Sequence, residues 1–234
     1  MKNNLIINGS GDYPGGSYDK ISIRGEGTIL TGVESDAFHV YGTSEVKENV
    51  ITRSVKILGE AEIGGDLEAQ ETLIMGTVSV GQNARLKKLK VLGTLDTGGS
   101  ISGNDANIKG SITVKGDAEF EEFHSSGGFE IKGLLNAEII KVALRYGEST
   151  AEEIGGGKIT IKRKRNSFLP FGGQEGTLAA KVIEGDDIIL ENTKADIVRG
   201  NKVKIGPGCQ IGLVEYRSDF AEDASSSIKM SKKI

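Results

Sequence analysis

Seven glycines lie seventeen residues apart in this chain, and this spacing restricts the possible folds more than any other feature. The seven are Gly25, Gly42, Gly59, Gly76, Gly93, Gly110 and Gly127. Regular spacing of this length is typical of repeat proteins, in which each repeat is one structural unit that packs on its neighbours. The fold prediction therefore begins from a unit of seventeen residues.

Each repeat has six positions at which apolar residues recur, two before the glycine and four after it. Around Gly59 these positions hold Val55, Ile57, Ala61, Ile63, Leu67 and Ala69. Short stretches of alternation predict strands with one face inward, and each break in the alternation predicts a corner. Three strands and three corners make a triangular coil of about 17 residues. Stacked coils of this kind predict an all-β fold, a single-stranded parallel β-helix or solenoid.

One corner of the coil carries a column of small polar residues, seven positions after the repeat glycine. The column is Asn49, Asp66, Asn83, Ser100 and Asp117. These residue types tolerate left-handed backbone and hydrogen-bond within turns, so a structural role is expected. A metal-binding acidic ladder is the alternative interpretation.

The register divides the chain into five segments. Residues 1–20 are expected to form an N-terminal arm and a partial first coil, and residues 21–144 the main β-helix. An irregular insertion is expected over 145–180 and further β-helix coils over 181–217, where a repeat of fifteen to sixteen residues resumes. Residues 218–234 are mostly polar and without periodicity, so disorder is expected there.

Composition limits the classes of partner and compartment. The net charge of −4 offers no general attraction for nucleic acid. The single cysteine, Cys209, cannot form an internal disulfide or a cysteine-based zinc site, which fits a reducing compartment. The first residues lack the apolar stretch of a signal peptide, and no run approaches the length of a membrane span. We therefore expect a cytoplasmic location.

Residues suited to catalysis are sparse. The two histidines, His39 and His124, lie at outward positions five coils apart, so we expect solvated surface side chains. The nearest match to a phosphate-binding loop, GGGKIT, places Ile159 where Ser or Thr would reach magnesium. We therefore predict no enzyme activity, no cofactor and no metal. The alternative is a carbohydrate-active or acyl-transfer enzyme on a β-helix, which requires clustered outward carboxylates or a histidine beside a loop.

Two surface features suggest contacts. Directly before the repeat glycines stand Tyr41, Leu58, Met75 and Leu92, an outward apolar stripe that marks either contact with a partner or another copy, or cover by residues 145–180. The second feature is a basic cluster followed by apolar residues, namely Lys162, Arg163, Lys164, Arg165, Phe168, Leu169 and Phe171. This segment is either a contact with anionic lipid, at about 1 kcal/mol per basic residue, or a connecting loop whose Phe side chains pack on the solenoid.

The ends of the solenoid are the expected polymer interface. An uncapped β-helix presents unpaired N–H and C=O groups to which another chain can add, and no capping helix is evident in the sequence. We assign the terminal coils to Ile6 at one end and to Ile211, Val214 and Tyr216 at the other.

The repeat style of GEAEIGGDLEAQETLIMGTVSVG and the segment IEGDDIILENTKADIVRGNKVKIGPGCQIGLVEY resemble the bactofilin family of bacterial cytoskeletal proteins, in its longer Gram-positive type. The resemblance covers roughly residues 20–216. It implies a right-handed β-helix that polymerises end to end without nucleotide into non-polar filaments. Such filaments often lie on the inner face of the cell membrane, as scaffolds for cell shape, polar organelles or motility machinery.

Overall fold

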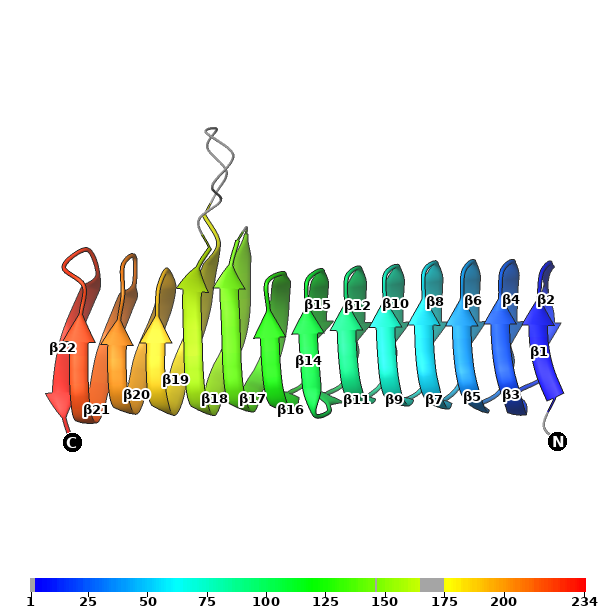
Figure 1. The fold of residues 1–234 in the computed structure, drawn as a ribbon, viewed down its shortest axis with the longest axis horizontal. Helices are drawn as coiled ribbons and strands as arrows, with labels where there is room; N and C mark the ends of the chain where they lie inside the picture. Colours follow the sequence, from blue (N-terminus) through cyan, green and yellow to red (C-terminus); the bar gives the residue numbers. More distant parts are fainter. Residues whose placement is uncertain (1–2, 146, 165–174) are drawn as a thin grey trace. The chain divides into compact units, whose positions relative to one another are not determined.

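The structure is a computed structural model that describes residues 3–145, 147–164 and 175–234. These residues form 22 β-strands and no helix, and the observed strand pairings within each unit are parallel (Figure 1). The chain consists of two compact units, residues 1–116 and 117–234. Each unit is a parallel β-solenoid, so the predicted fold class is confirmed.

The first unit stacks coils of seventeen residues. Its strands are β1 (Asn3–Ile7), β2 (Ser10–Tyr13), β3 (Gly16–Ile23), β4 (Glu26–Ile29), β5 (Val33–Val40), β6 (Thr43–Val46), β7 (Val50–Ile57), β8 (Glu60–Ile63), β9 (Leu67–Ile74), β10 (Thr77–Val80), β11 (Ala84–Val91), β12 (Thr94–Thr97), β13 (Ile101–Ser102), β14 (Asp105–Ile108) and β15 (Ser111–Val114). Strands β3, β5, β7, β9 and β11 pair side by side, and the short strands β4, β6, β8, β10 and β12 form a second sheet (Figure 1).

Burial confirms the three faces of each coil. Along β7, Val50 and Thr52 are buried, and the alternation then shifts by one residue before Val55 and Ile57 are buried. The shift marks a corner inside the strand, because a side chain changes face every residue only while the strand runs straight. The third face is the following short strand β8, whose two inward residues are buried. The six predicted apolar columns are therefore the core.

The repeat glycines are required by close approach between coils. A Cβ on Gly59 would lie 1.9 Å from the carbonyl oxygen of Gly42, and a Cβ on Gly76 would lie 1.9 Å from that of Gly59. No real Cβ tolerates such a distance, so this corner admits glycine alone. The first glycine of the column, Gly9, has nothing within 4 Å of its Cβ position.

The polar corner column is a hydrogen-bonded ladder. Asn49 Oδ1 accepts from the backbone N–H of Asp66 at 2.8 Å, and Asp66 Oδ1 accepts from that of Asn83 at 2.9 Å. Asn83 Oδ1 in turn accepts from the N–H of Ser100 at 3.0 Å. The structural interpretation is confirmed, but the side chains bond the next coil rather than their own turn. None of these residues adopts left-handed backbone, because Asn192 is the only described non-glycine residue with positive φ.

The N-terminal coil differs from its prediction. Residues 3–23 form a full coil of three strands, not a loose arm. Ile7 pairs with Ile23, sixteen residues later, because the turn after β2 is one residue shorter than the turn after β4. Ile7 is therefore the buried residue of the apolar column, and Ile6 points outward with 58% of its surface exposed.

The second unit is built from coils of more variable length. Its strands are β16 (Ala118–Ser125), β17 (Gly128–Leu144), β18 (Glu148–Arg163), β19 (Thr177–Leu190), β20 (Thr193–Ile205), β21 (Gln210–Glu222) and β22 (Ser227–Lys233). Along β17 and β18 the partner of Leu135 is Ile154, nineteen residues on. Between β19 and β20 the spacing is fifteen residues, as the shorter sequence repeat predicts.

Two predicted segments are wrong. The described part of the predicted insertion, residues 147–164 and 175–180, is not irregular, because β18 and the start of β19 lie within it and continue the core with Ile154, Ile159 and Leu178. The seventeen-residue register fails here only because the coils are longer. The expected disorder of residues 218–234 is also wrong, because β21 runs to Glu222 and β22 pairs with β21. The polar strand β22 has no alternation of apolar residues to bury, and its backbone pairing with β21 orders it instead.

The close approach at the glycine corner predicts unequal effects of the same substitution in one column. Gly59→Ala should destabilise the protein by at least about 2 kcal/mol, because the backbone of two coils must separate. Gly9→Ala should change the stability by less than about 1 kcal/mol, because nothing lies within 4 Å of its Cβ position. Denaturant unfolding at low protein concentration measures both, and equal effects would contradict this account of the corner.

Candidate functional site: an outward apolar stripe and two open sheet edges

The predicted apolar stripe lies on one outer corner of the first unit. Tyr41, Leu58, Met75 and Leu92 are between 38% and 48% exposed. Each backbone N–H donates to the carbonyl of a core residue one coil earlier, as Leu58 does to Val40 at 2.8 Å. This pairing holds the four side chains in successive layers, spaced by about 4.8 Å. The guanidinium of Arg24 lies 6.0 Å from the ring centroid of Tyr41 and extends the stripe by one coil.

The charges on the two sides of the stripe have opposite sign. Lys56 lies two residues before Leu58 on one face, and Glu60 lies two residues after it on the next face. Both side chains point outward, because their neighbours along the strands are buried. In the coil of Leu92, Lys90 lies two residues before it, whereas the acidic residue on the other side, Asp96, lies four residues after it.

The N-terminal edge of the first unit is open. Among the described residues, β1 pairs only with β3, and β2 pairs only with β4. The inward positions Leu5, Tyr13 and Tyr18 are half-buried, whereas the same columns one coil later are buried. The Tyr18 hydroxyl donates to the carbonyl of Pro14 at 3.1 Å. This end therefore presents unpaired backbone together with an apolar interior that is only partly covered.

The last coil of the second unit is more polar. The buried residues Ile205 and Val214 are followed in their columns by Glu222 and Ser231. Exposed Lys233 follows Tyr216 in the same way. Among the described residues β22 pairs only with β21, so its outer edge is open.

The predicted residues of this second end are not terminal. Ile211 and Val214 are buried, and β22 pairs with the strand that carries them. Tyr216 is half-buried and stacks on Phe220, with ring centroids 5.1 Å apart. The prediction that these three residues lie in the last coil is wrong, because β22 forms a further coil after them. Their assignment to the polymer interface stays a prediction.

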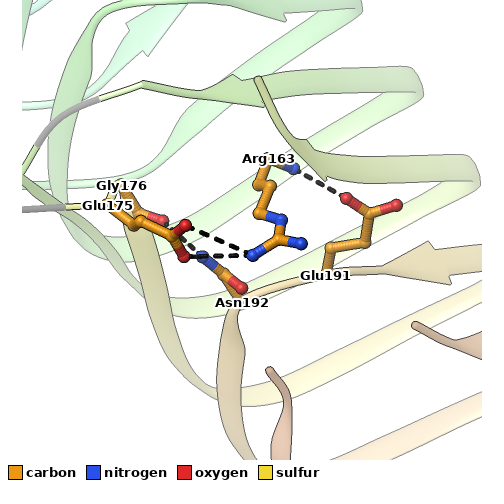
Figure 2. A network of polar contacts seen from close by, with 5 residues as sticks. All are labelled: Arg163, Glu175, Gly176, Glu191 and Asn192. Atoms are coloured by element: carbon orange, nitrogen blue, oxygen red, sulfur yellow. Dashed lines mark hydrogen bonds and ion pairs between the residues drawn. The ribbon is translucent and has the colours of Figure 1, made fainter. Parts of the chain in front are cut away.

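A network of polar contacts holds together both ends of the segment that carries the predicted lipid contact (Figure 2). Arg163 Nη1 lies 3.2 Å from Glu175 Oε2, and the Arg163 backbone N–H donates to Glu191 at 3.0 Å. Asn192 Nδ2 donates to Glu175 at 3.1 Å and to the Gly176 carbonyl at 3.3 Å. The network uses the charge of Arg163 internally, and no local sequence pattern marks its members.

The remaining lipid-contact residues divide into two groups. Lys162 and Lys164 are described and exposed. Arg165, Phe168, Leu169 and Phe171 lie outside the described residues.

The histidines point outward, as predicted, but His39 is only partly solvated. Burial lowers the pKa of His39 below its ordinary value of 6.5, and the nearby ammonium groups of Lys20 and Lys56 lower it further. His124 Nε2 lies 3.4 Å from Glu122 Oε2.

Two other side chains of a kind often used in catalysis, those of Arg199 and Cys209, are engaged in ion pairs or buried. Arg199 in a groove of the second unit forms ion pairs with Glu184 at 3.0 Å and Glu215 at 2.8 Å. Cys209 is buried, and burial raises the pKa of its thiol. Within the described ranges no cluster of His, Cys, Asp or Glu is suited to a metal ion, and no helix is long and apolar enough to cross a membrane.

Comparison with known proteins gives two full-length relatives. The chain is 52% identical over 231 residues to the uncharacterized protein YhbF of Bacillus subtilis strain 168, which covers 99% of this chain and 97% of the relative. It is 56% identical over 232 residues to the uncharacterized protein YhbE of the same organism, with 98% of each chain covered. No family model matches the chain, and no solved structure matches it.

The environment of His39 predicts a pH effect. Because its pKa is lower in the folded state, the unfolded state binds more protons just below pH 6.5, and stability should fall as the pH drops through this range. Titration by NMR should show a pKa below 6.5, and Lys56→Glu should raise it. Lys87→Glu, at an exposed site outside this group of cations, serves as the control. A His39 pKa that Lys56→Glu leaves unchanged would contradict the assignment.

Proposed function

We propose that this chain, which belongs to the same family as YhbE and YhbF of Bacillus subtilis, is a non-enzymatic scaffold that polymerises end to end. The observation that carries the proposal is the open N-terminal edge formed by β1 and β2, with its partly covered apolar interior. The resemblance to bactofilins supports the same function. The filaments would form without nucleotide and serve as a cytoskeletal element for cell shape or motility.

Polymerisation follows from the chemistry of a β-edge. Each coil of the solenoid satisfies its backbone by hydrogen bonds to the coils before and after it, as Leu58 N does with Val40 O. Among the described strands the first coil has a partner on one side alone, and the N–H and C=O groups on its other side are a template for another strand. Burial of Leu5, Tyr13 and Tyr18 by a second subunit would add a hydrophobic contribution to this pairing. Neither contribution requires a bound nucleotide.

The edge of β22 is the second surface proposed for growth. It offers unpaired backbone, but the columns that hold apolar residues in earlier coils end here in polar ones. These polar residues are Glu222, Ser231 and Lys233. Association through this edge would therefore depend on main-chain pairing and charge more than on apolar burial. We expect it to be weaker and more sensitive to salt than association through β1.

Contact with the inner face of the cell membrane is the second part of the proposal. Lys162 and Lys164 are exposed beside the network of Arg163 and Glu175, so two cations are available at the end of β18. Attraction to anionic lipid would add about 1 kcal/mol per basic residue near the surface. The proposal includes a cytoplasmic location, and partner proteins at the membrane would bind the assembled polymer.

A substitution at the open edge tests polymerisation. Ile6→Lys places a charge on β1, where 58% of Ile6 is exposed, and should abolish filaments seen by negative-stain electron microscopy without nucleotide. Ile51→Lys is the matched control, because Ile51 is 48% exposed on β7, away from the edge. Filaments that persist in Ile6→Lys, or a wild-type protein that sediments as a monomer at all concentrations, would contradict the proposal.

Vesicle sedimentation tests the lipid contact. The double variant Lys162→Glu and Lys164→Glu should bind phosphatidylserine vesicles at least about tenfold more weakly than wild type, and wild type should not bind pure phosphatidylcholine vesicles. The control reverses two exposed lysines of β20, Lys194→Glu and Lys204→Glu, for the same change in net charge. Equal loss in both variants would show a general charge effect and no specific contact.

A further inference from the structure

We propose that the stripe of Tyr41, Leu58, Met75 and Leu92 joins two copies of this chain side by side, with their first units parallel and coil matched to coil. The proposal concerns the lateral surface of the first unit and does not depend on end-to-end growth. It rests on the exposed stripe, on the glycines beside it and on the charges that flank it.

The stripe is contiguous and apolar. Its four side chains, each between 38% and 48% exposed, occupy successive coils at the same corner. At about 4.8 Å per coil they span roughly 14 Å. A contiguous apolar row of this kind on an otherwise polar surface is a mark of protein contact.

A column without side chains runs beside the stripe. Each stripe residue is followed by a partly exposed repeat glycine, such as Gly59 after Leu58 and Gly76 after Met75. The glycines are obligatory, because a Cβ there would meet the previous coil. The corner therefore carries a ridge of side chains next to a shallow notch, and the notch lies on the acidic side of the ridge.

The balance of charge differs between the ridge side and the notch side. On the ridge side the outward cations are Lys20, Lys56, Lys88 and Lys90. On the notch side the outward anions are Glu26, Glu60, Glu62 and Asp96. The ridge side also carries Glu71 and Asp105, in the farther of its two rows, which is the row of Lys20 and Lys88. In the row directly beside the stripe, the ridge side carries Lys56 and Lys90 and no carboxylate, and the notch side carries Glu26 and Glu60 and no cation.

Symmetry selects one arrangement of two copies. In an isologous pair the same surface faces itself across a two-fold axis. An axis parallel to the direction of coil stacking places the ridge of one copy in the notch of the other, and the cationic side of one opposite the anionic side of the other. Lys56 of each copy then faces Glu60 of its partner in the same layer.

The other two-fold arrangement is disfavoured. An axis perpendicular to the stacking direction makes the two stripes antiparallel and places ridge against ridge. It also places cations opposite cations and anions opposite anions, which is repulsive. Shape and charge therefore favour the parallel pair. The contact is small compared with the roughly 800 Å² per partner of a stable dimer, so it should be weak for single molecules and stronger when several copies are joined.

Site-specific cross-linking tests the arrangement. In Leu58→Cys, a short bismaleimide should join two copies at position 58, because position 58 of one copy lies opposite position 58 of the other in the parallel pair. Buried Cys209 should react little and serves as the internal control. The antiparallel arrangement predicts a different result, in which a mixture of Leu58→Cys and Met75→Cys cross-links better than either protein alone.

Charge exchange tests the pairing directly. Added to the Leu58→Cys protein, either Lys56→Glu or Glu60→Lys should reduce the cross-linked fraction about tenfold at low salt, because two attractive pairs become repulsive. A mixture of the two variants should restore cross-linking as mixed dimers. Glu68→Lys and Lys87→Glu, at exposed positions away from the stripe, should have no effect.

The outcomes separate this proposal from polymerisation. Cross-linking at position 58 should persist in the Ile6→Lys protein, in which end-to-end growth is blocked. Loss of cross-linking there would show that the lateral contact is a by-product of filament formation. Absence of cross-linking in the Leu58→Cys protein at high concentration, or insensitivity to the charge reversals, would overturn the proposal and leave the stripe to a different partner.

Discussion

Backbone hydrogen bonding between successive coils is the interaction on which the rest of this structure depends. Each strand pairs in parallel with the strand one coil later, and the coils approach so closely that the corner admits only glycine. The same registry brings like residues into columns. It buries the apolar columns, joins Asn49, Asp66 and Asn83 into a ladder, and places the stripe residues in adjacent layers.

Stacking of this kind has no internal limit, which explains why the edges matter. The hydrogen-bonding groups that join β7 to β9 inside the first unit are left without a described partner at the outer edge of β1. The chain covers the interior unevenly, with half-buried Leu5 and Tyr13 at one edge and polar Glu222 and Ser231 in the coil of β22. A scaffold assembled from such subunits would use the interaction that folds each one.

The sequence predicts the fold correctly where a constant repeat length places apolar residues at the buried positions of every coil. The glycine spacing predicted the inward residues of the first unit, such as Val55 and Ile57, and the fifteen-residue repeat predicted the pairing of Ile188 with Val203. It failed at Ile154, because a longer coil breaks the register while keeping the fold, and at β22, because main-chain pairing orders a polar strand. The contact of Arg163 with Glu175 has no local signal, since the two residues are twelve apart in the sequence and belong to no repeat.

Hydrogen exchange of the edge strands, followed as a function of protein concentration without nucleotide, tests the central claim most directly. If subunits add to the open edges, the backbone amides of β1 and β2 should become protected as concentration rises, while those of β7 remain protected throughout. Protection of the β1 and β2 amides that does not change with concentration would contradict the account.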